Sequence, residues 1–302
     1  MIIYNASGPR CTTLEELKEI DNSEACFILT KSATLEPREG NPKPRYYDNK
    51  FGSVNSMGLP NKGIDYYISI ANEFKKPYII SMSGLNLDEN LIMIDKIINA
   101  LATKKIYGIE INLSCPNIVG KGQLAYNFNE LDIYLKHIFK VLRGVKLNVG
   151  IKLLPYFEIE HFTIVGTILN KYPIDYITCI NSIGNGLIVD YLKESVTIKP
   201  KKGCGGIGGS YIKPTALSNV WNFYNVFKEL NSDIKIVGCG GIEKGCDAFE
   251  HILCGASTVQ IGTQFYKDGI NCFQTINYEL NNLMKSKDYI TYDDFRGKLK
   301  LL

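Results

Sequence analysis

The segment Asn112-Leu113-Ser114-Cys115-Pro116-Asn117 carries the residue types in this chain that are best suited to chemistry. It follows an apolar run at 109–111, and its thiol stands between a strand end and a proline. Two asparagines and a serine flank the thiol and can hydrogen-bond a planar polar ligand. A structural cysteine normally lies inside an apolar segment. The pattern therefore indicates a functional thiol at a strand end, where α/β barrels place their catalytic groups.

Cys115 is also the strand-end residue best able to accept a proton. The three histidines, His137, His161 and His251, all lie in predicted helices outside the strands, which disfavours histidine as the general base. A free thiol has a pKa of about 8.5, and nearby cations would increase its thiolate fraction. We therefore expect Cys115 to be the base.

Two lysines occupy positions that buried strands usually fill with apolar residues. Lys31 ends one predicted strand, and Lys152 lies within Gly150-Ile151-Lys152-Leu153. A lysine near the end of a covered strand indicates an anionic partner. The alternative is a surface side chain that reaches water along its apolar stem.

Glycines follow the last two predicted strands, in Val237-Gly238-Cys239-Gly240-Gly241 and in Gln260-Ile261-Gly262-Thr263. Bare backbone N–H groups at these positions can bind a phosphate, and the corresponding loops of α/β barrels commonly do so. Ordinary tight turns are the alternative. Neither loop matches the Gly-x-Gly-x-x-Gly or Walker pattern, so FMN or a phosphorylated substrate fits better than a dinucleotide.

Short β-branched runs alternate with longer amphipathic segments along the chain, which is typical of parallel βα units. The pattern predicts a (β/α)8 barrel with strands at Ile2–Asn5, Phe27–Lys31, Tyr78–Ser83, Ile109–Ser114, Val149–Leu153, Tyr176–Asn181, Ile234–Gly238 and Thr258–Gly262. Apolar stripes at helical spacing follow Asp88 and Asn129, which we expect to cap two of the helices.

Two connections, Leu35–Lys62 and Ser182–Lys213, are longer than barrel loops usually are. The alternating segment Glu194–Lys199 predicts a hairpin that protrudes from the top of the barrel. This hairpin would be either a subunit contact or a solvated ribbon. We find no repeat or linker, so we expect residues 1–302 to form one domain.

The composition excludes several classes of function. The chain has 302 residues, 45% of them hydrophobic, and its 34 basic and 31 acidic residues are evenly spread. No basic run with interleaved aromatic residues indicates a nucleic-acid partner. No apolar stretch is long enough to span a membrane, and the first residues lack the pattern of a signal peptide. We therefore expect a soluble cytoplasmic protein.

The nine cysteines are scattered, odd in number and without a Cys-x-x-Cys pair, which suits a reducing compartment. Cys239, Cys246 and Cys254 are spaced too widely for a zinc knuckle. We expect no metal site.

Several motifs occur together in the order that one enzyme family shows. They are Thr30-Lys31-Ser32, Leu35-Glu36-Pro37-Arg38-Glu39-Gly40-Asn41-Pro42, Asn55-Ser56-Met57-Gly58-Leu59-Pro60-Asn61, Asn112–Asn117, Lys152-Leu153-Leu154-Pro155-Tyr156-Phe157, Asn181-Ser182-Ile183-Gly184-Asn185-Gly186, Gly205–Gly209 and Gln260–Thr263. With them the chain resembles the class 1 dihydroorotate dehydrogenases, and within these the soluble class 1A branch. Members usually carry further residues before the motif that begins here at Asn5, so we expect the barrel floor to be closed differently or the sequence to begin late.

This resemblance implies an FMN-containing barrel, typically a cytosolic homodimer, that oxidises dihydroorotate to orotate in pyrimidine synthesis. The electrons pass to fumarate, which becomes succinate. It implies that Cys115 removes a proton from C5 while hydride leaves C6 for the flavin N5, and it places Lys31 beside Cys115 among the catalytic residues.

The resemblance also assigns the binding residues. Those expected to bind the substrate are Lys31, Asn55, Met57, Gly58, Leu59, Asn112, Asn117, Asn181 and Ser182. Those expected to bind FMN are Ala6, Ser7, Lys31, Ser32, Asn112, Lys152, Gly209, Gly240, Gly241, Gly262 and Thr263. Carboxamides suit the substrate ring because they donate and accept hydrogen bonds at once. The two lysines would stabilise negative charge at the N1 and C2 region of the reduced flavin.

Two other interpretations remain. One is the catalytic subunit of the NAD-linked class 1B enzyme, which shares the barrel but needs an iron–sulfur flavin partner subunit; Lys31-Ser32 and Pro155-Tyr156-Phe157 favour class 1A over it. The other is a non-catalytic flavin-binding or partner-binding scaffold, which the presence of Cys115 and the ring-binding asparagines disfavours.

Overall fold

The computed structural model describes residues 2–113 and 124–302 of the chain. Eight parallel strands form a nearly closed barrel, in the hydrogen-bonded order β1-β14-β13-β8-β7-β6-β5-β2. All eight predicted strands are confirmed, although β2 covers only two of the five residues predicted for it, and Ser114, the predicted end of β6, lies outside the described residues. They are β1 Ile3–Asn5, β2 Ile28–Leu29, β5 Tyr78–Met82, β6 Gly108–Asn112, β7 Asn148–Lys152, β8 Tyr176–Cys179, β13 Lys235–Cys239 and β14 Thr258–Ile261.

A side chain joins the two ends of this sheet, β1 and β2. The Asn5 amide nitrogen donates to the Leu29 carbonyl oxygen at 2.6 Å, and its oxygen accepts from the Leu29 N–H at 3.0 Å. One backbone bond, from the Cys26 N–H to the Ile3 carbonyl at 2.9 Å, lies beside it. The Asn5 side chain therefore closes the seam between β1 and β2, where backbone hydrogen bonds join the other neighbouring strands.

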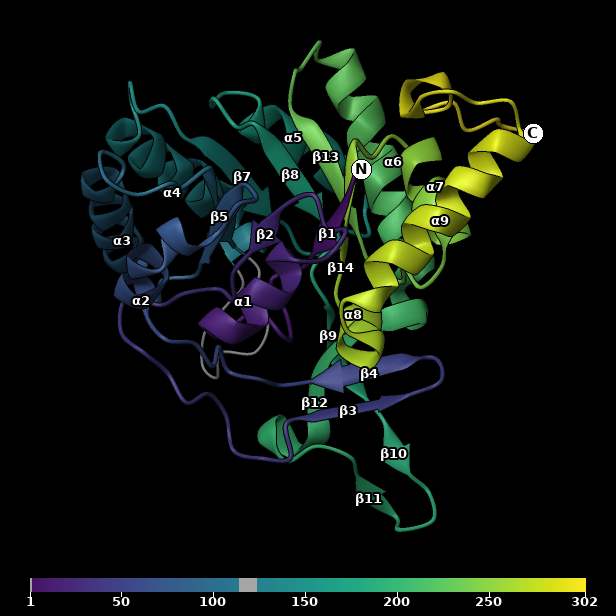
Figure 1. Ribbon diagram of the computed structural model, residues 1–302, viewed down its shortest axis with the longest axis horizontal. Coiled ribbons are helices and arrows are strands. Elements are labelled where there is room, and N and C mark those ends of the chain that lie inside the picture. Colours follow the sequence, from purple (N-terminus) through teal and green to yellow (C-terminus); the bar gives the residue numbers. More distant parts are fainter. Residues whose placement is uncertain (1, 114–123) are drawn as a thin grey trace.

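Helices cover the outside of the barrel, as Figure 1 shows. The α-helices are α1 Leu14–Asp21, α2 Ile64–Ser69, α3 Leu87–Ala100, α4 Phe128–Val141, α5 Ile159–Leu169, α6 Lys213–Glu229, α7 Gly245–Leu253, α8 Thr263–Asp268 and α9 Asn271–Ser286. Short 3-10 helices are η1 Ala71–Glu73, η2 Leu124–Tyr126, η3 Pro200–Gly203, η4 Gly209–Ile212 and η5 Tyr292–Asp294. The predicted apolar stripes of α3 and α4 are buried against the core.

The caps of these two helices differ from the prediction. Asn86 caps α3 and Asn127 caps α4, each with an extended backbone and a side chain that accepts a hydrogen bond three residues on, from the Glu89 and Glu130 N–H groups. Asp88 and Asn129, the expected caps, lie inside the first helical turn instead. The carboxylate of Asp88 suits that turn because the helix dipole is positive there.

The two long connections form a second sheet together. Four strands, β3 Tyr46–Asn49, β4 Gly52–Asn55, β12 Cys204–Gly208 and β9 Ile183–Leu187, pair in the order β3-β4-β12-β9. The predicted hairpin is present as a short ribbon of β10 Val189–Asp190 and β11 Ser195–Val196, which projects beyond this sheet at one end of the barrel (Figure 1). The pairing of the two connections was not predicted.

Within the described residues, no helix has both the length and the apolar character needed to cross a membrane.

We expect Asn5→Ala to destabilise the barrel strongly. The substitution leaves the N–H and C=O of Leu29 without their partner inside a buried wall, which should lower the free energy of unfolding by about 3 kcal/mol. Urea denaturation measures the loss. Asn148→Ala is the matched control, because Asn148 also donates to a backbone carbonyl, that of Tyr107, but at an exposed site. A loss below about 0.5 kcal/mol is expected there, and equal losses would contradict a special role for the seam.

Candidate active site

One cavity of about 250 Å³ lies at the carboxyl ends of the barrel strands. Every one of the eight strands, or the residues directly after it, contributes to the lining. The structure brings to this cavity the predicted residues Ala6, Ser7, Lys31, Ser32, Asn55, Met57, Gly58, Leu59, Asn112, Lys152, Asn181, Ser182, Gly209, Gly240, Gly241, Gly262 and Thr263. Their individual roles stay predictions.

Two predicted residues, the base Cys115 and the substrate ligand Asn117, lie outside the described residues. The described part of the chain brings another thiol, Cys239 at the end of β13, to the cavity. Burial raises the pKa of Cys11 to about 12 and that of Cys254 to about 11, so these two side chains are poor thiolates. Cys239 is the control for Cys115 because it lines the cavity.

A chain of polar side chains runs along one wall of the cavity. The Ser32 hydroxyl contacts the Ser7 hydroxyl at 3.0 Å and accepts from the Asn112 amide nitrogen at 3.2 Å. The Asn112 oxygen accepts from the Asn181 amide nitrogen at 3.2 Å, and the Asn181 oxygen accepts from the Ser182 N–H at 2.8 Å. These contacts orient both amides.

The second sheet, formed by β3, β4, β12 and β9, also lines the cavity. Asn55 ends β4 and donates to the Gly206 carbonyl of β12 at 3.1 Å. A Cβ atom on Gly206 would lie 2.2 Å from the Ser182 hydroxyl, so only glycine lets Ser182 and Asn55 approach the same part of the sheet.

Asn61 holds the loop at 57–59 and was not predicted as a site residue. Its amide nitrogen donates to the Leu59 carbonyl at 2.8 Å and to the Thr34 hydroxyl at 2.9 Å, and its oxygen accepts from the Gly63 N–H at 2.7 Å. Asn61 is 4% exposed. It belongs to the Asn55–Asn61 motif, but the sequence did not indicate that its amide binds the loop itself.

Lys31 and Lys152 are both buried where they line the cavity, with exposed fractions of 9% and 6%. Lys152 donates to the Gln260 amide oxygen at 2.9 Å. Lys31 makes no ion pair with any described residue. A buried cation facing a cavity favours an anionic ligand there. The alternative of surface lysines is therefore wrong for both residues.

Glu110 and Gln260 also line the cavity, and both were missed as site residues. The Gln260 amide nitrogen donates to a Glu110 carboxylate oxygen at 2.7 Å, and the Thr178 hydroxyl donates to the same oxygen at 2.8 Å. All three side chains are fully buried. A charged residue inside Ile109-Glu110-Ile111, two positions before Asn112 and so on the same strand face, was the signal that could have identified Glu110.

The glycines after β13 and β14 leave bare backbone at the cavity. Gly241 has φ +73°, and a Cβ atom there would lie 2.4 Å from the Lys213 Cβ. Gly209 approaches Gly52 in the same way, with a Cβ position 2.6 Å from the Gly52 Cα. Such loops can direct several N–H groups toward one anion.

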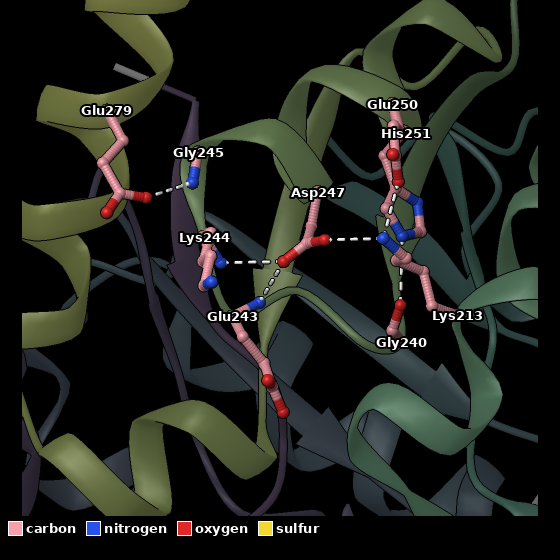
Figure 2. Close-up of polar contacts among 9 residues, drawn as sticks. All are labelled: Lys213, Gly240, Glu243, Lys244, Gly245, Asp247, Glu250, His251 and Glu279. Carbon is pink, nitrogen blue, oxygen red and sulfur yellow. Dashed lines mark hydrogen bonds and ion pairs between the residues drawn. The ribbon is translucent and has the colours of Figure 1, made fainter. Parts of the chain in front are cut away.

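Side chains from α6 and α7 anchor the loop at 240–244, as Figure 2 shows. One Asp247 oxygen accepts from the N–H groups of Glu243 and Lys244 at 2.9 and 2.8 Å, and the other accepts from the Lys213 ammonium at 2.7 Å. Burial acts to lower the pKa of Lys213, but hydrogen bonds to Asp247 and Glu250 outweigh it and hold that pKa well above its usual value. The loop is thus tied to two helices.

His251 completes this anchor from inside α7. Its Nε2 lies 3.1 Å from the Gly240 carbonyl oxygen and so must carry the proton, while Nδ1 has no hydrogen-bond partner among the described residues. Burial lowers the pKa of His251 to about 4, although the bond to Gly240 and the charge of Asp247 act to raise it. His251 is therefore a neutral structural donor, which agrees with the expectation that histidine is not the base.

Comparison with known proteins identifies a family. The family model for dihydroorotate dehydrogenase matches residues 2–284. The dihydroorotate dehydrogenase (fumarate) of Saccharomyces mikatae is 51% identical over 99% of this chain and 94% of its own length. That of Saccharomyces cerevisiae is 50% identical over 98% of this chain and 93% of its own. A crystal structure of ligand-free DHODH from Eimeria tenella matches with a TM-score of 0.81 at 17% identity, covering 99% of this chain and 88% of that one, which supports the fold.

We expect acid to destabilise the protein through His251. Its pKa of about 4 lies below the unfolded value of about 6.5, so the unfolded chain binds a proton first as the pH falls. The effect is absent above the unfolded pKa, grows as the pH falls toward the folded pKa, and is constant below it. Between pH 8 and pH 5 we expect a loss of about 2 kcal/mol, measured by urea denaturation.

The variant His251→Gln can still donate to Gly240 but does not titrate, so this part of the pH dependence should disappear. His137→Gln, at an exposed position on α4, is the control and should keep the wild-type dependence. If His251→Gln behaved as the wild type, another group would be responsible.

Proposed function

The chain belongs to the dihydroorotate dehydrogenase family, and from this premise we propose that it oxidises (S)-dihydroorotate to orotate and passes the electrons to fumarate. The observation that carries the proposal is one cavity that gathers two buried lysines, three asparagines and two glycine loops at the barrel strand ends. This reaction belongs to de novo pyrimidine synthesis. The relatives named for fumarate favour this acceptor over NAD.

FMN is the cofactor that we propose for the cavity, and the residues present fit it. The loops at Gly209, Gly241 and Gly262 offer backbone to a phosphate, and a side chain at the first two positions would collide with its neighbours. Lys31 and Lys152 supply buried positive charge for an electron-rich ring. Bound FMN would supply the acceptor for the hydride that dihydroorotate loses.

The asparagines are the groups that we propose to bind the substrate. Asn112 and Asn181 already share a hydrogen bond, so each presents a defined edge to a ring that carries both C=O and N–H groups. Asn55, at the end of β4, and Ser182, directly before β9, also line the cavity. We assign the same task to Asn117 and to the backbone at Met57, Gly58 and Leu59.

Cys115 is the base that we propose for C5 of dihydroorotate. Its thiolate would take the C5 proton while the C6 hydrogen leaves with its electron pair, so the ring gains a double bond. Lys31, a cation that lines the same cavity, would favour the negatively charged groups of this step.

The proposal also includes a cytoplasmic homodimer. The support for the dimer is the ribbon of β10 and β11, which carries exposed apolar side chains. The exposed fractions are 56% for Val189, 79% for Tyr191, 80% for Leu192 and 47% for Val196. Exposed apolar side chains on a projecting ribbon are typical of a subunit contact, whereas a solvated ribbon would carry polar side chains. Analytical ultracentrifugation should find two chains per particle, and a single chain at micromolar concentration would contradict the dimer.

The proposed function is tested anaerobically on the purified yellow protein. Dihydroorotate should bleach the flavin absorbance, and fumarate should restore it, whereas NAD should not. Recolouring by NAD alone would indicate the class that needs an iron–sulfur partner. A flavin that dihydroorotate does not bleach would contradict the substrate.

The same experiment tests the base. Cys115→Ala should retain the flavin and slow the bleaching at least about 100-fold, the usual contribution of a positioned base. Cys115→Ser should keep a slow reaction. Cys239→Ala removes the thiol that the described residues bring to the cavity and should bleach at close to the wild-type rate; the opposite ranking would make Cys239 the base.

A further inference from the structure

The Gln260 amide can satisfy its neighbours in only one orientation. The Lys152 ammonium only donates, and the Glu110 oxygen accepts from both Thr178 and Gln260. Rotating the amide by half a turn would place its carbonyl against the carboxylate and its NH₂ group against the ammonium. The Tyr4 hydroxyl lies 3.1 Å from the same amide nitrogen and receives its second N–H. Glu110 therefore selects the orientation that presents an acceptor to Lys152.

The hydrogen bonds among Lys152, Gln260, Glu110 and Thr178 also place a negative charge, that of Glu110, close to the cavity. Glu110 is fully buried, and its second carboxylate oxygen has no hydrogen-bond partner among the described residues. Charges interact strongly in such a dry interior. The neutral amide of Gln260 lies between this carboxylate and the Lys152 ammonium. The negative and the positive charge are therefore close to each other without a direct contact.

We propose that Glu110 is a positioning residue that acts through Gln260. It holds the amide that anchors Lys152, and its charge offsets part of the positive potential that Lys152 and Lys31 present to the cavity. In this way it sets how readily a bound flavin accepts electrons. The inference rests on the proposed function, because it takes FMN as the occupant of the cavity.

The decisive variant is Glu110→Gln in the FMN-loaded protein. The new amide keeps an acceptor oxygen for Thr178 and Gln260 but removes the charge, so reduction of the flavin should become easier. We expect a more positive midpoint potential, equivalent to at least about a tenfold higher ratio of reduced to oxidised flavin at a fixed ambient potential. Spectroelectrochemical titration measures it. Glu110→Asp keeps the charge and should stay close to the wild type.

Thr178→Val is the matched control. It removes a hydrogen bond to the same Glu110 oxygen and leaves the charge in place. The protein should lose stability while the midpoint potential of the flavin stays unchanged. If Glu110→Gln left the potential unchanged, or moved it no more than Thr178→Val does, the role of Glu110 would be purely structural and the inference would be wrong.

Gln260→Met tests separately whether the Gln260 amide connects Glu110 to Lys152, and it serves as the test if Glu110→Gln does not fold. It retains both charges and most of the side-chain volume but removes the hydrogen bond between Lys152 and Gln260. The dissociation constant of FMN, measured by fluorescence quenching on reconstitution of the apoprotein, should rise about tenfold. An unchanged dissociation constant of FMN would contradict the proposal that Glu110 acts through Gln260.

Wild-type bleaching by dihydroorotate, recorded beside these titrations, distinguishes a failure of the proposed function from a failure of the role proposed for Glu110. Bleaching together with an unmoved potential in Glu110→Gln would overturn the positioning role alone. A wild-type flavin that takes up electrons at the electrode but not from dihydroorotate would overturn the proposed function, while the potential of the variant would still decide the role of Glu110.

Discussion

The seam between β1 and β2 is the constraint on which the rest of the site depends. Asn5 closes this seam through both polar groups of Leu29, and the chain enters the cavity directly afterwards on each side, at Ala6 and Ser7 and at Lys31 and Ser32. The contact between the Ser7 and Ser32 hydroxyls follows from this closure. Without it, two parts of the lining that lie far apart in the sequence would have no reason to meet.

Charge burial is the second organising fact. A barrel interior is dry, so each ionic group must be paired, bonded or directed at a ligand. Lys152 is held by Gln260, Gln260 by Glu110, and Glu110 by Thr178, and these residues come from four different strands. Asp247, which anchors the loop after β13, is also paired and hydrogen-bonded. One of its carboxylate oxygens accepts from backbone N–H groups of the loop and the other from the Lys213 ammonium.

The second sheet turns an ordinary barrel into an enclosed site. Its strands come from two distant connections, and its register places Asn55 opposite Gly206. Glycines make this sheet possible because a Cβ atom at Gly205 or Gly206 would collide with Asn55 or Ser182. The same glycines hide the strands from sequence analysis, since glycine disfavours a strand when it is judged locally.

The sequence by itself predicted the barrel from its eight apolar runs, and the resemblance of its ordered motifs to one family implied the class of chemistry. The lysines at strand ends are local signals, because a strand end and a charged residue within it can be recognised from near neighbours. The predicted caps Asp88 and Asn129 were wrong by two residues, because Asn86 and Asn127 offer the same capping chemistry two positions earlier in the chain.

Only the tertiary structure decided which residues support the site. Hydrogen bonds between segments far apart in the sequence hold Glu110, Gln260 and Asn61, such as those from Asn61 to Thr34, 27 residues away, and from Gln260 to Tyr4, 256 residues away. Cys239 reaches the cavity because β13 lies between β8 and β14 in the barrel. The sequence marks Glu110 as a charged residue inside an apolar run, but it does not show the partners that hold this carboxylate. The same holds for the joining of β4 with β12. Hydrogen bonds between distant segments depend on distance and direction in space, and the fold alone sets both.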